Sequence, residues 1–245
     1  MRISSATATV ILLAGALASA QDKAQDRAPD KTQDRQTESV SGLSAAEAEE
    51  GFVPIFDGKS LDGWVGLKED TSSYYVQDGM LICKETGHVH IFSEKEYANF
   101  VLRLQIKLDP GGNNGIGIRA QISDAPHIHG MEIQVLDDSY YEDGDPFHLK
   151  DYQHHGSIYG VVPAKTGHLK PAGEWNDQEI VCDGRHVKVI LNGAVIVDAD
   201  LDEVKPVDDS EHPGLKFTKG HIGLHAHGNY GAEVFFRNLR VKELD

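Results

Sequence analysis

The sequence predicts an all-β protein, a sandwich of two sheets with a short N-terminal helix. Residues 100–108 alternate strictly between apolar and polar side chains, which is the period-2 pattern of a half-buried strand. Asp183-Gly184 and Asn192-Gly193 are favoured in two-residue hairpin turns, so residues 178–198 are predicted to form an antiparallel meander of three strands. Roughly a dozen strand candidates and no long helical pattern indicate a sandwich.

The first 20 residues have the form of a secretory signal peptide. Arg2 precedes a mostly apolar run from Ala6 to Leu17, and Ala18-Ser19-Ala20 supplies a small-residue cleavage site. The alternative, a permanent membrane anchor, is disfavoured because the run is too short to span a bilayer. We therefore expect residues 1–20 to be removed and the protein to be secreted or periplasmic, with no membrane association after cleavage.

Residues 21–42 are predicted to be a disordered charged linker. The element Gln-Asp-Lys/Arg recurs there, charges of both signs nearly cancel, and no apolar periodicity is present. Such a composition cannot bury a core, so we expect this segment to be dispensable for folding. Ser44-Ala45-Ala46-Glu47 then has the form of a capping box and predicts a short helix, which opens a domain over residues 43–245.

Further strand candidates are spread along this domain. They are 74–77, 80–83, 116–121, 131–136, 157–162, 221–226 and 234–241. The only two cysteines, Cys83 and Cys182, both lie in apolar strand-like runs. Export permits a disulfide between them, and two buried free thiols are the alternative.

The charge balance excludes one class of partner. The chain has 23 basic and 39 acidic residues, for a formal net charge of −16. An acidic surface of this kind repels phosphate backbones, so we expect no nucleic acid partner.

Alternation places several polar side chains opposite the core on three of the predicted strands. Arg119 faces away from its neighbouring isoleucines, Glu132 and Gln134 face away from Met131 and Ile133, and His225 and His227 face away from Leu224. Nearby glycines allow a ligand to approach the backbone. This pattern predicts a groove that hydrogen-bonds a polyol, against the alternative of ordinary cross-strand ion pairs on a solvated face.

Histidine pairs raise the question of a metal. The chain has 13 histidines, and His88-Val89-His90, His127-Ile128-His129 and His225-Ala226-His227 are of the His-x-His form. Two imidazoles on one strand face suit Zn²⁺ or a similar divalent ion together with a carboxylate. No HExxH or Cys/His zinc spacing is present, so a metal cofactor and hydrogen-bonded surface histidines both stay open.

Glu132 to Asp137 have the spacing E-x-Q-x-x-D, which is similar to the E-x-D-x-x-E signature of retaining glucanases. Gln134 lacks the middle carboxylate, and Asp137 is one methylene shorter than Glu. A retaining mechanism needs two carboxyl groups about 5–5.5 Å apart, which the shorter acid makes difficult.

An ordered set of segments resembles the 3-keto-disaccharide hydrolase domain family. They are Phe56–Trp64, Gly111–Arg119, Gly130–Asp137, Gly156–Gly160, Glu174–Asn176, Leu191–Gly193, Gly220–Gly228 and Phe236–Asn238. The resemblance implies a jelly roll of the concanavalin A-like lectin/glucanase type, export, and cleavage of sugars whose C3 hydroxyl is oxidised to a ketone. Two departures stand out, because Asn113-Asn114-Gly115-Ile116 replaces the usual Asn-Ser-Gly-Ile and His225 stands where relatives have glutamine.

The implied chemistry needs a base, a stabiliser of the enolate and an acid for the leaving oxygen. We expect Glu132 to remove the C2 proton, and Arg119 or His227 to stabilise the enolate, with or without a metal. His225, His227 or Asp137 is expected to protonate the leaving group. Further expected contacts to an oligosaccharide or glycoside substrate are Asn114, Gln134, Asp137, Tyr159 and His225. A non-catalytic carbohydrate-binding module and a retaining β-glucanase are the alternative functions.

Overall fold

The computed structural model describes residues 43–144, 148–228 and 232–245. The predicted signal peptide and linker, residues 1–20 and 21–42, lie outside the described residues, so both stay predictions. In the described parts of the chain, no helix is long and apolar enough to cross a membrane.

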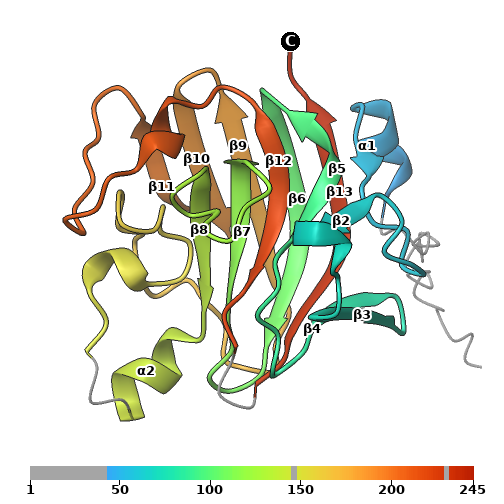
Figure 1. Cartoon of the computed structure of the whole chain (residues 1–245), viewed down its shortest axis with the longest axis horizontal. Coiled ribbons are helices and arrows are strands. Elements are labelled where there is room, and N and C mark those ends of the chain that lie inside the picture. The colour runs from blue at the N-terminus through green and yellow to red at the C-terminus, as the bar shows by residue number, and fades with distance from the viewer. Residues whose placement is uncertain (1–42, 145–147, 229–231) are drawn as a thin grey trace, which may run out of the picture. The chain divides into compact units, whose positions relative to one another are not determined.

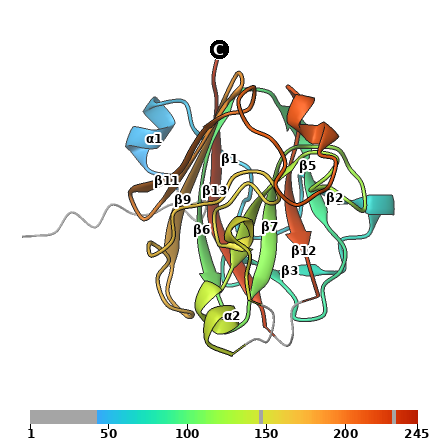
Figure 2. The same cartoon turned by 90° about the vertical axis from the view of Figure 1, so that its left-hand side faces the viewer.

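The fold is the predicted sandwich of two antiparallel sheets, seen as two layers in Figure 2. The strands of the larger sheet are β1 (Val53–Pro54), β3 (Tyr74–Gln77), β4 (Met80–Cys83), β6 (Phe100–Leu108), β9 (Asn176–Asp183), β10 (His186–Leu191), β11 (Ala194–Asp200) and β13 (Val234–Glu243). The strands of the smaller sheet are β2 (Trp64–Gly66), β5 (Ile91–Tyr97), β7 (Asn113–Ala120), β8 (Met131–Leu136) and β12 (Gly220–Ala226). The helices are α1 (Ala45–Glu49) and α2 (Asp138–Gly144), with 3₁₀ turns η1 (Leu67–Glu69), η2 (Asp151–Gln153) and η3 (Pro213–Lys216).

The order of the strands determines which strands lie side by side and which of their faces are outside the core. The larger sheet runs β11-β10-β9-β6-β13-β4-β3, with β1 beside β13, and the smaller sheet runs β2-β5-β12-β7-β8 (Figure 1). The core lies between the sheets, where alternate residues of β6 meet the apolar faces of β7, β8 and β12. The other face of β12, β7 and β8 is therefore available for function.

Most predicted elements are confirmed. The strand over residues 100–108 alternates buried and half-buried side chains as expected. Asn192 and Gly193 take φ values of 51° and 84°, the positive φ pair that the hairpin turn needs. The strand predicted over residues 157–162 is wrong, because Ile158 forms only isolated bridges to Ile133 and Val162. Residues 158–162 form a turn, in which the N–H of Ile158 donates to the carbonyl of Val162 and the N–H of Val162 donates to the carbonyl of Ile158. No extended ladder therefore forms.

The two cysteines are free and buried, so the disulfide alternative is not realised. Burial raises the pKa of both Cys83 and Cys182 to about 12. The two thiols therefore stay protonated and behave as small apolar side chains.

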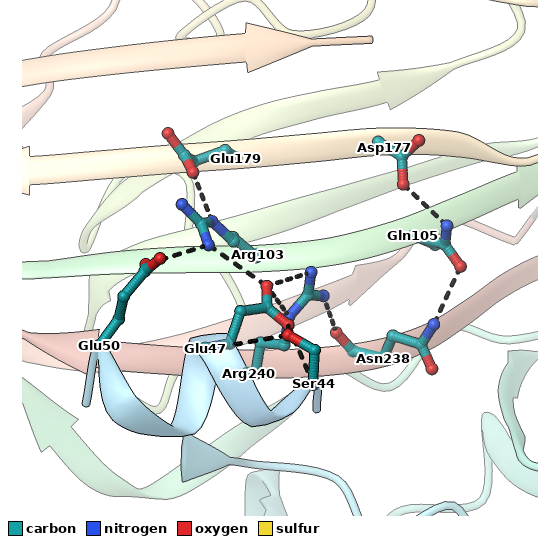
Figure 3. Close-up of polar contacts among 9 residues, drawn as sticks. All are labelled: Ser44, Glu47, Glu50, Arg103, Gln105, Asp177, Glu179, Asn238 and Arg240. Carbon is teal, nitrogen blue, oxygen red and sulfur yellow. Dashed lines mark hydrogen bonds and ion pairs between the residues drawn. The ribbon is translucent and has the colours of Figure 1, made fainter. Parts of the chain in front are cut away.

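Helix α1 docks on the outer face of the larger sheet through one carboxylate, as Figure 3 shows. Ser44 and Glu47 form the predicted capping box. Oε1 of Glu47 then accepts from Nε of Arg240 at 2.8 Å and lies 3.2 Å from Nη1 of Arg103. Burial alone would raise the pKa of Glu47, but the bonds from Arg240 and Ser44 lower it below its ordinary value. The ionised, largely buried carboxylate of Glu47 thus holds helix α1 between the guanidinium groups of Arg103 and Arg240.

We expect Glu47→Gln to lower the free energy of unfolding by about 1–3 kcal/mol, because bonds to charged groups have that value and both arginines lose their anion. Glu50→Gln is the matched control on the same helix, since Glu50 is 52% exposed and lies 3.6 Å from Arg103. That control should stay within about 0.5 kcal/mol. Urea unfolding of the two variants measures the difference, and equal losses would contradict the central role of Glu47.

Candidate active site

The outer face of the smaller sheet carries the candidate site. Ile116 on β7, Ile133 on β8 and Leu224 on β12 face the core and are fully buried. Alternation sends the intervening residues to the opposite face. In register, Gly117 lies opposite both Glu132 and Gly223, and Gly115 lies opposite Gln134 and His225.

Glycines on β7 make room for two of the functional side chains rather than for a ligand. A Cβ added at Gly115 would overlap Oε1 of Glu132, and a Cβ added at Gly117 would overlap Nε2 of His225. Glu132 from β8 and His225 from β12 therefore lie over the bare backbone of the strand between them. The predicted close approach of a ligand to these glycines is replaced by a close approach of the protein's own site residues.

Glu132 is a buried carboxylate held by two imidazoles. Its Oε1 lies 2.7 Å from Nε2 of His227 and 3.5 Å from Nδ1 of His225. Glu132 is 3% exposed, and the His227 side chain, at 31%, is the most accessible of the three. No described residue hydrogen-bonds Oε2 of Glu132, so that oxygen remains for a substrate.

The two partners of the shortest contact form an ion pair. Burial opposes ionisation of Glu132, but the charges of His227 and His225 outweigh it and hold the pKa of the carboxyl well below its ordinary value. Burial likewise opposes protonation of His227, but the Glu132 carboxylate raises the pKa of this imidazole above its ordinary value. The carboxyl of Glu132 is therefore ionised at neutral pH, and the imidazole of His227 keeps its proton to a higher pH than an ordinary histidine.

His90 lies behind this pair, immediately before β5. Its ring centroid is 5.3 Å from that of His225 and 6.1 Å from that of His227. Burial, and then the charges of His225 and His227, lower the pKa of His90 to about 4. His90 thus supports the pair as a neutral ring, and its only signal in the sequence is the His88-Val89-His90 pattern.

A cavity of about 410 Å³ opens over this face, large enough for a small saccharide. Its lining includes four of the predicted residues and others that the prediction missed. They are Asn113, His127, Glu132, Gln134, Leu136, Tyr141, His148, Leu149, Gln153, Tyr159 and His227. The structure thus brings together Glu132, Gln134, Tyr159 and His227, while His225 is fully buried beneath Glu132. Among the lining residues that the structure describes, Glu132 is the only carboxylate.

The predicted position of Arg119 is wrong. Its guanidinium donates to the carbonyls of Ala98 and Phe217 and to the side chain of Asn99, and it does not line the cavity. The pairing of β7 with β12 shifts register along this stretch, and Arg119 has φ of 49°. This bulge interrupts the alternation on which the prediction depended, so Arg119 fixes the turn between β5 and β6 instead.

Asn114 and Asp137 also lie away from the cavity. Asn114 shares the core side of β7 with Ile116 and donates to the hydroxyl of Tyr74 at 3.2 Å, and its neighbour Asn113 lines the cavity instead. Asp137 accepts from the backbone N–H of Gly111 at 3.0 Å and from Ser139 at 2.8 Å. Both side chains take part in hydrogen bonds within the protein, and neither is among the residues that line the cavity.

The possible metal donors of the site are Glu132 and its neighbouring histidines. Within the described part of the chain, no group of three or more His, Cys, Asp or Glu side chains is arranged to hold a metal ion. Glu132 and His227 lie against one another, so these two donors satisfy each other.

Comparison with known proteins identifies the family of the domain. Residues 51–242 match the 3-keto-alpha-glucoside-1,2-lyase-like domain. A relative from Bacteroides thetaiotaomicron, described as a 3-keto-disaccharide hydrolase, is 28% identical over 235 residues, which cover 80% of this chain and 79% of the relative.

Two solved structures from Parabacteroides distasonis, both candidate glycosyl hydrolases, share the fold. One has a TM-score of 0.71 at 26% identity, covering 83% of this chain and 98% of the other. The second has a TM-score of 0.66 at 29% identity, covering 79% and 99%.

Proposed function

This chain belongs to the 3-keto-alpha-glucoside-1,2-lyase-like family, and on that premise we propose that it cleaves 3-keto-glycosides, including 3-keto-disaccharides, between C1 and the glycosidic oxygen. It is a carbohydrate-active enzyme of the hydrolase or lyase type, as the relatives indicate. The observation that carries the proposal is the Glu132–His227 ion pair facing a saccharide-sized cavity.

The ion pair suits removal of a proton next to a ketone. A ketone at C3 acidifies the C2 proton, because the resulting anion is an enolate. Glu132 stays ionised, and its Oε2 takes no hydrogen bond from a described residue, so it is the base in the proposal.

His227 supplies the opposite charge beside the base. Its Nε2–H is directed at Glu132, and its positive charge stabilises the enolate oxygen that develops at C3. Glu132 is only 3% exposed, and low solvent exposure strengthens both electrostatic interactions. The chain's own residues thus provide base and stabiliser on one side of the cavity.

A retaining β-glucanase mechanism has less support. It needs a second carboxyl group about 5–5.5 Å from the first. Asp137, the sequence candidate, is bonded to Gly111 and Ser139 outside the cavity. Glu132 therefore has no carboxylate partner among the described lining residues.

We expect activity to fall as pH rises through the pKa of His227, because the imidazolium is lost there. That pKa is raised above its ordinary 6.5, so the alkaline decline lies above the pH at which an ordinary histidine loses its proton. Glu132 has its pKa lowered from 4.5, so it stays ionised through mildly acid pH. The lowered pKa of Glu132 stabilises the folded state fully above pH 4.5, and the raised pKa of His227 stabilises it fully below pH 6.5. The ion pair therefore contributes most to stability between pH 4.5 and 6.5 and less outside that range.

The measurement is the pH profile of kcat/KM on a 3-keto-glycoside. His227→Gln should lower kcat/KM by about 10²-fold and remove the alkaline decline that follows loss of the imidazolium proton. An alkaline limb that persists unchanged in His227→Gln would assign the titration to another group.

The direct test of the function is incubation of the purified chain with a 3-keto-disaccharide and with its unoxidised parent. Release of monosaccharide from the first alone supports the proposal. Binding without cleavage of either sugar would favour the lectin-like alternative.

We also propose that the protein acts outside the cytoplasm, since residues 1–20 have the pattern of a signal peptide. N-terminal sequencing of the protein from the periplasm or medium tests this. A mature chain that begins near residue 21 is the expected result, and a chain retained in the cytoplasm with Met1 contradicts it.

A further inference from the structure

The proposed reaction still lacks a donor for the leaving oxygen. Asp137 is bonded outside the cavity, His225 is fully buried, and Nε2 of His227 is directed at Glu132. We propose that Tyr159 protonates the leaving oxygen and then activates the incoming water, an assignment that rests on the proposed function.

Tyr159 stands directly opposite Glu132. The bridge between Ile133 and Ile158 is antiparallel, and the N–H of Tyr159 donates to the carbonyl of Glu132 at 2.9 Å. Residues paired across an antiparallel bridge share one face with Cβ atoms about 4.5–5.5 Å apart. Both side chains line the cavity.

The histidines lie on the other side of Glu132. In the sheet, β8 is followed by β7 and then by β12. His225 lies on β12, and His227 follows directly after the end of this strand. Glu132 therefore stands between an imidazolium on one side and a phenol on the other. A sugar ring over Glu132 has the enolate stabiliser and the acid at opposite edges, as elimination requires.

The Tyr159 hydroxyl is set up to donate. Nε2 of Gln153 donates to its oxygen at 3.4 Å, which leaves the phenolic O–H for another acceptor. Burial raises the pKa of Tyr159, so the group keeps its proton at neutral pH. Edge-on contacts hold the ring, with centroids 5.6 Å from Tyr152 and 6.2 Å from His127.

The steps balance. In elimination, Glu132 takes the C2 proton, the C2–H electrons form the C1=C2 bond, the C1–O bond breaks, and the Tyr159 proton goes to the leaving oxygen. In hydration, water adds its oxygen to C1, its proton returns to the Tyr159 phenolate, and Glu132 returns a proton to C2. One water is consumed, and both residues regain their starting states.

The test is Tyr159→Phe on two substrates that differ only in the leaving group. Methyl 3-keto-glucoside needs a proton on its leaving oxygen, and 4-nitrophenyl 3-keto-glucoside does not. We expect kcat/KM to fall about 10²–10⁴-fold for the methyl substrate and less than about 10-fold for the nitrophenyl substrate. Exchange of the C2 proton with D₂O should persist, because Glu132 is untouched.

Tyr75→Phe is the matched control. The Tyr75 hydroxyl donates to Glu233 at 3.0 Å from β3 of the larger sheet, so its loss should leave both rates unchanged. Equal losses on the two substrates, loss of C2 exchange, or no loss at all in Tyr159→Phe would overturn the assignment. If the unaltered enzyme cleaves neither 3-keto-glucoside, the proposed function fails, and the assignment fails with it.

Discussion

Replacing Glu132 by Gln is expected to lower kcat/KM on a 3-keto-glycoside by about 10²–10⁴-fold, while the affinity for the same sugar changes by less than about 10-fold. The amide keeps the shape of the carboxyl group but cannot accept the C2 proton. Steady-state kinetics gives the first quantity. Calorimetric titration of the inactive variant with the 3-keto-glycoside gives the second, since the ligand is no longer consumed.

Glu94→Gln is the matched control for this substitution. Glu94 is an exposed residue of β5 in the same sheet, so its charge is screened, and it is not among the residues that line the cavity. The control should keep both activity and affinity. Parallel loss of activity and affinity in Glu132→Gln, with a lower melting temperature, would assign Glu132 a structural role in holding His225 and His227.

Strand alternation predicted much of this site because the period of two holds without interruption on β8 and β12. Glu132 and Gln134 line the cavity, and His225 and His227 contact Glu132, as the sequence pattern required. The same rule failed at Arg119, where a bulge in β7 changes the face without any polar or apolar signal in the sequence. Strand alternation alone would have predicted Asn113, and not Asn114, as the residue that lines the cavity, because Asn113 and Gly115 lie on the same face of β7.

The opposite wall of the cavity comes from loops, which local patterns do not place. His127 precedes β8, and Gln153 and Tyr159 follow α2, so their positions depend on long-range contacts. Family resemblance found Tyr159 but missed His127 and Gln153. Local sequence patterns also could not predict the Glu132–His227 ion pair. It depends on the register of β7 with both β8 and β12, which brings Glu132 close to His227.

The substrate preference is the second large effect. We expect cleavage of a 3-keto-glucoside to exceed cleavage of the parent glucoside by at least about 10⁴-fold, which corresponds to about 5 kcal/mol of barrier. In the parent sugar, the C2 proton has only alcohol-like neighbours and is far too weakly acidic for a carboxylate base. The described cavity lining offers one carboxylate, and an ordinary retaining glycosidase uses two acids about 5–5.5 Å apart on the unoxidised sugar.

The isotope in the product separates the two mechanisms. If Glu132 removes the C2 proton and returns one after water adds at C1, a reaction run in D₂O places deuterium at C2 of the released 3-keto-sugar. Direct displacement at C1 by water or a carboxylate never breaks the C2–H bond, so it leaves C2 unlabelled. Mass spectrometry and proton NMR of the released sugar read the label, and the same sugar incubated in D₂O without enzyme corrects for spontaneous exchange beside the ketone. Comparable cleavage of the unoxidised glucoside, with no enzyme-dependent deuterium at C2, would exclude elimination and restore the glucanase mechanism despite the position of Asp137.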